Sequence, residues 1–413
     1  MDLHGGLMGR YSMKIIIAHN FYQHGGGEDA VFSSEIALLR RHGHQVIEYS
    51  RQNAEILQYG IADFATLPAR TVWNWRSYLD LKQLIRKHKP DTAHFHNTFP
   101  LISPAAYAAC WEAGVPIVQT LHNSRLFCPS GSLFFRGRYC QACMGKALPW
   151  PGIVRACYRD SKLQTGWVGL MTAAHRLQGT WTRRIGRYIV FNAFFQRKFI
   201  QAGLPAEKIA IKPHFLEDPG RGSHGGNYAL YVGRLADSKG VATLLRAWEK
   251  LDIPLKICGA GPMEEEVKNA CQQPGKKIEF IRYTEREKVF ELMKEMAFLI
   301  WPSEAVESFG LVAIEAFACG KAVISSGLGA MAELVEDHRN GIEFRAGDAE
   351  DLARKVQWAW AHPDEIALMG ENARQKYEAK YTADLNYAQL MDIYHSAVQS
   401  QAEEIRLSPF PIL

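Results

Sequence analysis

No apolar run in this 413-residue chain approaches the roughly 20 residues that a membrane-spanning helix needs, so no transmembrane segment is expected. The first dozen residues lack the charged and then apolar layout of a signal peptide. The chain also has no short-period repeat and no low-complexity tract. Its 47% hydrophobic and 22% charged content is typical of a soluble globular protein. We therefore expect a cytoplasmic protein with reduced thiols.

A second absence concerns metal binding. The chain contains no Asp-x-Asp pair, a spacing with which many enzymes hold Mg²⁺ against a diphosphate. Negative charge on such a group would have to be compensated by cationic side chains or by N–H groups at a helix N-terminus. We therefore expect no catalytic metal and no other catalytic cofactor.

Acidic residues are scarce in the first half of the chain. Residues 1–213 contain 26 Lys and Arg against 12 Asp and Glu, whereas residues 214–413 contain 22 against 31. This asymmetry predicts two domains with different partners. At 132–139 and 183–199 basic side chains stand beside aromatic ones, which suits an anionic membrane surface better than nucleic acid. We expect peripheral contact with the cytosolic face of a membrane and no nucleic acid; a merely solvated basic face is the alternative.

Short apolar strands alternate with amphipathic helices along most of the chain. In the first half we predict strands at 14–18, 45–49, 92–96 and 116–120, and helices at 29–42 and 104–113. After a glycine-rich polar linker at 214–227, strands at 229–232, 255–258, 278–281 and 298–301 alternate with helices at 241–251, 263–271 and 285–296. This pattern predicts an α/β fold of two Rossmann-like domains, each a parallel sheet covered on both faces. Ligands are then expected at the carboxyl ends of the strands.

The segment 307–320 (ESFGLVAIEAFACG) joins a loop to a helix that is apolar on nearly every face. Glu315 lies inside this helix, so its carboxylate needs a partner, and a distant arginine is the alternative to a ligand. The free N–H groups of Phe309, Gly310 and Leu311 would form an anion site at the helix N-terminus. The N–H groups suit a phosphate, and the carboxylates of Glu307 and Glu315 suit hydroxyl groups. We therefore predict a ligand that is both phosphorylated and polyhydroxylated.

Two loops at strand ends carry glycines and cations. The first contains Gly26 and Gly27, where the backbone can approach a phosphate or a sugar closely. The second (YVGRLADSKG) holds Arg234 and Lys239 before a helix, where two cations could neutralise a diphosphate. A solvated loop charge is the alternative for either cation taken alone.

The first loop also matches a dinucleotide fingerprint. Gly25, Gly27 and Ala30 follow the pattern Gly-x-Gly-x-x-Ala, and Glu48 lies about 20 residues farther on. However, six residues separate the strand from Gly25, where a dehydrogenase would turn at once. An NAD-dependent oxidoreductase therefore stays an alternative.

Taken in this order, the motifs resemble those of the family 4 retaining glycosyltransferases, which have the GT-B architecture. The resembling segments are GGGE (25–28), TLHN (120–123), GRLADSKG (233–240), GAGP (259–262) and ESFGLVAIEAFACGKAVISS (307–326). The resemblance extends from about residue 14 to residue 398. It implies two Rossmann-like domains facing each other across a cleft, an acceptor-side domain at 1–213 and a donor-binding domain at 222–382. A C-terminal helix at about 383–400 would pack back on the first domain.

The resemblance also implies how a donor nucleotide would be held. Arg234 and Lys239 would bind its diphosphate, and Gly26 and Gly27 would close over the phosphates. Glu315 would hold the ribose hydroxyls.

The resemblance places the transferred sugar in the same cleft. Glu307 would bind the sugar hydroxyls, and His122 would lie beside the sugar. The family often has glycine where this chain has Ser308, which leaves the identity of the sugar open.

Three histidines lie near the ends of two predicted strands. His94 and His96 alternate on one strand, and His122 follows the next. A metal triad of the three is conceivable. Because no carboxylate accompanies them at ligand spacing, we expect them to line the cleft instead. For His122, a purely structural hydrogen bond is the alternative to a catalytic role.

Four of the eight cysteines lie within 30 residues: Cys128, Cys140, Cys143 and Cys157. A Cys-x-x-Cys pair flanked by single thiols can close a tetrahedral thiolate site, and the intervening segments are loop-like. We predict one structural Zn²⁺ here. Unligated thiols are the alternative, and an iron–sulfur cluster or a redox pair is a third reading.

Together these patterns predict a metal-independent retaining glycosyltransferase. It would move a hexose-type sugar from a nucleoside diphosphate sugar to a glycan or lipid-linked acceptor, in cell-surface polysaccharide or glycolipid biosynthesis. A nucleotide-sugar epimerase on the same scaffold is the nearest alternative. An NAD-dependent oxidoreductase and a non-catalytic nucleotide-sugar-binding protein are the others.

Overall fold

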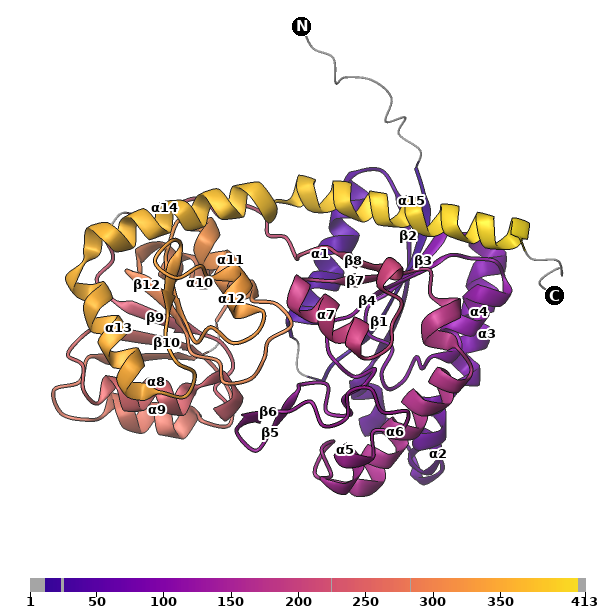
Figure 1. Cartoon of the computed structure of the whole chain (residues 1–413), viewed down its shortest axis with the longest axis horizontal. Helices are drawn as coiled ribbons and strands as arrows, with labels where there is room; N and C mark the ends of the chain where they lie inside the picture. The colour runs from indigo at the N-terminus through magenta and orange to yellow at the C-terminus, as the bar shows by residue number, and fades with distance from the viewer. Residues whose placement is uncertain (1–11, 24–25, 224, 283, 408–413) are drawn as a thin grey trace, which may run out of the picture.

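The computed structural model describes residues 12–23, 26–223, 225–282 and 284–407, with side chains described to residue 403. Two domains lie side by side, each built on a six-stranded sheet (Figure 1). All paired strands of both sheets run parallel. The predicted α/β fold of two Rossmann-like domains is thus confirmed.

The N-terminal sheet has the strand order β2-β1-β3-β4-β7-β8. Its strands are β1 (Lys14–Phe21), β2 (Gln45–Gln52), β3 (Thr92–Phe95), β4 (Ile117–Thr120), β7 (Arg187–Val190) and β8 (Ile209–Ile211). The helices of this domain are α1 (Gly27–Arg41), α2 (Ile61–Val72), α3 (Trp75–His88), α4 (Ala105–Glu112), α5 (Trp150–Val154), α6 (Lys162–Leu177) and α7 (Ala193–Gln201). Successive β1 side chains point to opposite faces: Ile15 and Ile17 pack with α1, and Ile16 packs with α3 and α4.

The C-terminal sheet has the order β11-β10-β9-β12-β13-β14. Its strands are β9 (Ala229–Val232), β10 (Leu255–Gly259), β11 (Ile278–Arg282), β12 (Phe298–Trp301), β13 (Val323–Ser325) and β14 (Gly341–Glu343). Its helices are α8 (Val241–Trp248), α9 (Glu264–Cys271), α10 (Arg286–Glu295), α11 (Leu311–Ala318), α12 (Met331–Leu334), α13 (Ala349–Ala361) and α14 (Pro363–Lys380). Leu230 packs with α10 and α11, whereas Tyr231 packs with α8 and α13, so both faces of the sheet are covered.

Both sheets reverse their strand order at one point. In the C-terminal sheet the reversal falls between β9 and β12, and in the N-terminal sheet between β1 and β3. Loops that leave the carboxyl ends of strands on the two sides of such a point diverge and open a ligand crevice. The loops that carry Arg234 and Glu307 follow β9 and β12, and those that carry Gly26 and His96 follow β1 and β3.

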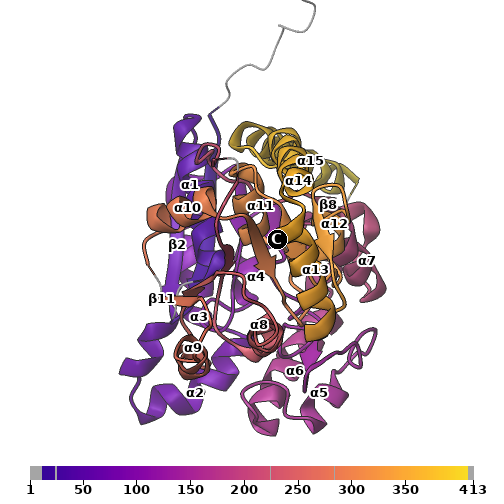
Figure 2. The ribbon, with the colours of Figure 1, turned by 90° about the vertical axis from the view of Figure 1, so that its left-hand side faces the viewer.

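A long C-terminal pair of helices joins the two domains. Helix α14 covers the C-terminal domain, and α15 (Ala383–Leu407) runs on across the N-terminal domain (Figures 1 and 2). The Tyr394 hydroxyl lies 2.8 Å from His94 Nδ1, and Arg187 Nε donates to Ser396 Oγ at 3.0 Å. The apolar core that begins at β1 and α1 therefore continues through α15 into the C-terminal domain.

Several elements are not predicted by the sequence pattern, namely α2, α3, α6 and the strands β7 and β8. Between β4 and α6 the chain makes a long excursion with the two-residue strands β5 (Phe134–Phe135) and β6 (Arg138–Tyr139) and the short helix α5. Short 3₁₀ turns lie at Asn53–Gln58, Ala206–Lys208 and Asp237–Lys239, and a π turn lies at Thr180–Arg184. Within the described part of the chain, no helix has the length and apolarity to cross a bilayer.

Candidate active site

One cavity of about 340 Å³ lies where the carboxyl ends of the two sheets meet. His122 and Asn123 line it from the N-terminal domain, and Lys239, Glu307 and Ser308 line it from the C-terminal domain. The structure thus brings His122, Lys239 and Glu307, which are far apart in sequence, to one cavity.

Lys239 and Glu307 form an ion pair on the C-terminal wall. Lys239 Nζ lies 2.7 Å from both carboxylate oxygens of Glu307. Ser303 and Trp301 donate further hydrogen bonds to the same carboxylate, so it is held firmly in place. The neighbouring Gly240 has φ +71°, and a Cβ at this position would overlap the Pro302 carbonyl. The β9 and β12 loops can therefore meet only because residue 240 is glycine.

Arg234 lies in the same loop as Lys239 but is exposed and does not line the cavity. The Tyr231 hydroxyl donates to the Arg234 backbone carbonyl at 2.9 Å and fixes the turn. The guanidinium takes no part in the hydrogen bonds and ion pairs found within the described ranges. It is therefore free to meet a ligand from solvent.

The first turn of α11 faces the glycine-rich loop of the other domain. Gly310 is the N-cap of α11, and a Cβ there would overlap the Trp301 ring. A Cβ on Gly27 would lie 3.1 Å from Leu311 Cδ1, so the first turns of α1 and α11 touch across the domain boundary. Phe309 is buried against the rings of Phe191 and His214. The N–H groups at the start of α11 thus stand at the edge of the cleft.

Glu315 lies one turn into α11 with a side chain only 16% exposed. Its partner is Arg286 of α10, at 3.2 Å from Oε1, which is the kind of distant arginine that the sequence admits as the alternative to a ligand. Burial raises the pKa of the Glu315 carboxyl, and Arg286 partly offsets this effect. The Arg286 side chain is about half exposed, at 48%.

His122 belongs to a buried stack of histidines. His96 Nδ1 lies 2.9 Å from His122 Nε2, and His122 also stacks on His214. Burial chiefly, and then His96 and His214, lower the pKa of His122 well below its usual value. The imidazole at the cavity wall is therefore neutral at physiological pH.

A buried carboxylate stands beside these histidines. Glu35 of α1 lies 3.1 Å from His96 Nε2, and ligand atoms of Glu35, His94 and His96 all lie within 4.8 Å of one another. The expectation that no carboxylate accompanies the histidines is therefore wrong. Lys212 Nζ already lies 2.8 Å from Glu35 and supplies the positive charge. Although burial raises the pKa of Glu35, Lys212 and His96 hold it well below its usual value.

Glu28 and Asn123 belong to the motifs GGGE and TLHN, but the sequence assigns a role to neither. Asn123 Nδ2 donates to Glu28 Oε1 at 3.2 Å, which ties the β4 loop to the first turn of α1. Burial raises the pKa of the Glu28 carboxyl, and Asn123, Tyr22 and Arg125 oppose this effect. A glutamate directly after three glycines is a visible signal for Glu28, and Glu35, two turns farther along the apolar face of α1, is another.

The NAD-type fingerprint does not have the required geometry. Gly25 lies outside the described residues, and β1 extends to Phe21, so fewer residues separate the strand from the glycines than the sequence predicts. Glu48 pairs in register with Ile17 in the middle of β2 and forms an exposed ion pair with Arg40 at 2.7 Å. It is thus far from the end of β2, where a ribose-binding acid is required.

The fold and the interdomain cleft are those of the GT-B glycosyltransferases. The crystal structure of Anabaena HepE in complex with UDP superposes with a TM-score of 0.65 at 18% identity, covering 93% of this chain and 100% of that one. Residues 26–217 match the model of "Glycosyltransferase Family 4", and residues 217–376 match that of "Glycosyl transferases group 1". The chain belongs to the family 4 glycosyltransferases.

Two curated relatives share part of this similarity. An uncharacterized glycosyltransferase of Methanocaldococcus jannaschii is 30% identical over 150 residues, which are 36% of this chain and 42% of that protein. The O-antigen chain mannosyltransferase C of Escherichia coli is 27% identical over 181 residues, 43% of this chain and 49% of that protein. The matches thus span less than half the length of these relatives.

Proposed function

We propose that the protein transfers a hexose-type sugar from a nucleoside diphosphate sugar to a glycan or lipid-linked acceptor, with retention of configuration and without a catalytic metal. The observation that carries this proposal is the interdomain cavity on which His122, Lys239 and Glu307 converge. The UDP complex of the similar HepE fold supports a nucleoside diphosphate donor.

In this proposal the diphosphate binds beside α11. Arg234 and Lys239 neutralise it, and the N–H groups of Phe309, Gly310 and Leu311 donate to its oxygens. Gly26 and Gly27 close over the phosphates from the other domain, where Gly26 has open space around it. The positive charge that a metal would supply then comes from the protein itself.

The sugar occupies the cavity between Glu307 and His122. The Glu307 carboxylate accepts hydrogen bonds from sugar hydroxyls while Lys239 keeps it oriented. A neutral His122 can accept a hydrogen bond from a sugar hydroxyl or donate one to it, without repelling developing positive charge on the sugar ring. Glu315 holds the ribose hydroxyls outside this cavity.

Chemically, the acceptor oxygen forms a bond to the anomeric carbon on the face from which the diphosphate departs. The bond from that carbon to the phosphate oxygen breaks, and the acceptor proton passes to the leaving phosphate. The nucleoside diphosphate then leaves. No separate carboxylate base is required in this mechanism. This agrees with the cavity, where the Glu307 carboxylate is already paired with Lys239.

Incubation with nucleoside diphosphate sugars in EDTA, with and without acceptor extracts, tests this function. A transferase releases one nucleoside diphosphate per glycosylated product, and nuclear magnetic resonance shows the donor's anomeric configuration in that product. An epimerase converts the donor without acceptor, and a binding protein releases nothing. Either of these results would contradict the proposal.

The acceptor-side domain also carries an apolar surface that fits a membrane. Helices α2, α5 and α6 lie at one end of this domain (Figure 1). Exposed apolar side chains occur on and beside these helices: Leu57, Ile61, Phe64, Leu148, Trp150, Val154, Leu163, Leu170 and Leu177. Arg155, Arg159 and Lys162 stand exposed among them. Apolar anchors interleaved with cations are typical of peripheral contact with anionic lipid.

The location of this surface differs from the sequence prediction. In the segment 183–199, Phe195 and Phe199 are buried, and Arg187 bonds to Ser396 and Ser400 of α15. Arg184 lies over the Trp111 ring. This segment therefore stabilises the domain, and we place the membrane contact on α2, α5 and α6 instead.

A further inference from the structure

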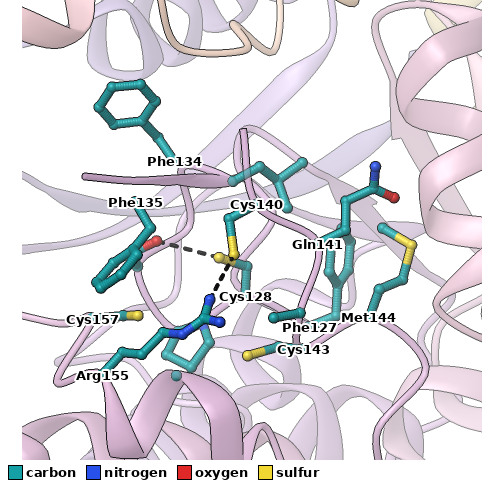
Figure 3. Close-up of a pocket in the computed structure, with 15 residues that line it drawn as sticks. Phe127, Cys128, Phe134, Phe135, Cys140, Gln141, Cys143, Met144, Arg155 and Cys157 are labelled. Carbon is teal, nitrogen blue, oxygen red and sulfur yellow. Dashed lines mark hydrogen bonds between the residues drawn. The ribbon is translucent and has the colours of Figure 1, made fainter. Parts of the chain in front are cut away.

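A second cavity, of about 20 Å³, lies in the excursion between β4 and α6. All four clustered cysteines line it: Cys128, Cys140, Cys143 and Cys157. Figure 3 shows these thiols gathered around one small space, with the Arg155 side chain reaching in among them. A volume of this size holds one atom or one water molecule.

The thiols reach this space from three separate turns. Cys128 closes a turn in which its N–H bonds to the Ser124 carbonyl and its own carbonyl accepts from Gly131. Cys140 and Cys143 follow the β5–β6 hairpin, and the Cys140 N–H donates to Leu133. Cys157 follows α5 and donates to the Gly152 carbonyl at 3.0 Å. The backbone therefore converges on the cavity independently of any sulfur contact.

The excursion has little regular secondary structure, although Phe127 and Leu133 anchor it in the buried core. Its regular structure amounts to two two-residue strands and one five-residue helix. Five of the eight non-glycine residues with positive φ in the described structure lie between 133 and 160: Leu133, Arg136, Ala156, Arg159 and Asp160. Such conformations persist only where the surroundings enforce them. A metal ion bound by the four thiols would add such a constraint to the packing that already surrounds this segment.

Two neighbours suit a thiolate cluster. Arg155 Nη1 donates to Cys140 Sγ at 3.3 Å and places a positive charge beside the sulfurs. Gly152 packs so tightly that a Cβ there would lie 3.2 Å from Cys143 Sγ. Four thiolates around a divalent cation carry two net negative charges, which a nearby guanidinium partly balances.

We propose that Cys128, Cys140, Cys143 and Cys157 bind one Zn²⁺ ion as a tetrathiolate site that fixes this excursion. Each thiol loses its proton to solvent as its Zn–S bond forms, so four protons leave and no oxidant or reductant is needed. In the structure the four sulfurs do not form a set whose atoms all lie within 4.8 Å of one another. Zinc–sulfur bonds of about 2.3 Å would therefore draw the sulfurs inward.

The buried histidines are a poorer metal site. Both His94 ring nitrogens already have partners, in the hydroxyls of Tyr394 and Thr120. Glu35 is neutralised by Lys212. A cation there would have to displace a buried lysine, whereas the thiols of the cysteine cavity would give up only hydrogen bonds, to Ser130 and to the Pro149 carbonyl.

The zinc site would also shape the active site. Gly131, Ser132 and Phe134 line the interdomain cavity, and Phe134 lines the cysteine cavity as well. A metal that fixes residues 128–143 therefore fixes the wall where an acceptor approaches His122. This last step rests on the proposed glycosyl transfer, but metal binding itself does not.

The test is elemental analysis of the full chain, purified without a metal-affinity step or chelator. We expect close to one zinc per chain, with X-ray absorption showing a shell of sulfur atoms at about 2.3 Å. Cys140→Ser and Cys143→Ser should each lose the zinc and lower the melting temperature by about 5 °C or more. Cys271→Ser, at a half-exposed thiol of the other domain, should keep both unchanged.

Three results would overturn the proposal: zinc-free wild-type protein, zinc retained by both serine variants, or iron in place of zinc. If the serine variants fail to fold, the wild-type absorption spectrum still decides, because a shell of nitrogen or oxygen ligands excludes the four cysteines. These readouts use neither donor nor acceptor. Failure of the zinc site is thus separate from failure of the glycosyl-transfer assignment.

Discussion

At the scale of single residues, the cleft depends on a few charges that the fold brings together. Lys239 and Glu307 meet across 68 residues of sequence, and Glu35 and Lys212 across 177. The first pair faces the cavity, whereas the second is buried behind the histidines. The first is therefore available to a ligand, and the second holds the structure that supports it.

Arg234→Ala and Lys239→Ala should each reduce turnover about 100-fold, because removing one charge-stabilising donor costs about 3 kcal/mol. Steady-state kinetics and melting temperature, measured together, separate catalysis from folding. The matched control is Lys250→Ala, which breaks an exposed lysine–glutamate pair in the same domain and should leave turnover unchanged. Near-normal turnover in both variants would remove these residues from the diphosphate site.

Acid should destabilise the protein through its buried histidines. Burial above all lowers the pKa values of His94, His96, His122 and His214 in the folded state. As pH falls below the unfolded value of about 6.5, the unfolded chain binds protons that the folded chain cannot, so stability decreases. Each histidine then contributes up to about 1.4 kcal/mol per pH unit.

Thermal unfolding should therefore show a steep fall in melting temperature between pH 7.5 and pH 5.5. His214→Phe keeps the ring contacts with Phe191 and Phe309 and should make the fall shallower. His338→Asn, at an exposed histidine with positive φ, should not. A melting temperature that is flat over this range would contradict the account.

At the scale of elements, the start of α11 is the critical junction. The helix is apolar and buried, and its N-cap touches Trp301 at the end of β12. Its first turn also meets Gly27 of α1. One short helix thus positions the Glu315 carboxylate, the contact between the domains and the N–H groups of the proposed anion site.

Gly310→Ala should destabilise the protein by about 1–3 kcal/mol or more, because the new methyl overlaps the Trp301 ring in a packed core. Gly26→Ala is the matched control, since a Cβ there meets no atom within 4 Å. Chemical denaturation measures both free energies of unfolding. Equal free energies of unfolding for the two variants would show that the Trp301 ring can shift to accommodate the methyl group, and would contradict this prediction.

The sequence predicts some of these elements well and others not at all. Strands 229–232 and 298–301 have the predicted bounds because they are short apolar runs with clear ends. Helix α2 is not predicted because Pro68 lies inside it. Ile61 and Phe64 also face solvent, so its apolar residues do not mark a buried helix face. The pair Glu35–Lys212 is not predicted either, since residues so distant in sequence meet only through the fold. For Glu315 the sequence admits a distant arginine but does not identify it as Arg286.

At the scale of the whole molecule, a helix and a hydrogen bond connect the two domains. Helix α15 ties the C-terminal domain to the N-terminal sheet, and Asn192 Nδ2 donates to the Ser308 carbonyl at 2.7 Å across the cleft. The two halves nevertheless differ in charge, with the basic excess in residues 1–213. We propose that the donor and the membrane are recognised by different domains.

Binding to vesicles should rise with anionic lipid and fall with salt, because each surface cation contributes on the order of 1 kcal/mol. Ile61→Glu combined with Phe64→Glu should weaken cosedimentation at least 10-fold without altering donor affinity. Leu368→Glu replaces an exposed leucine of the C-terminal domain and should have no effect. If the wild-type protein binds no anionic vesicle, the surface on α2, α5 and α6 does not contact a membrane and the prediction is wrong.

Calorimetric titration with UDP, GDP, ADP and dTDP and their sugars, in EDTA, tests the central claim most directly. The account predicts that one nucleoside diphosphate and its sugar bind without a divalent cation. It also predicts that the Arg234→Ala, Lys239→Ala double variant, while still folded, loses this binding. The account is contradicted if no nucleotide binds, if binding strictly requires Mg²⁺ or Mn²⁺, or if the double variant binds as tightly as the wild type.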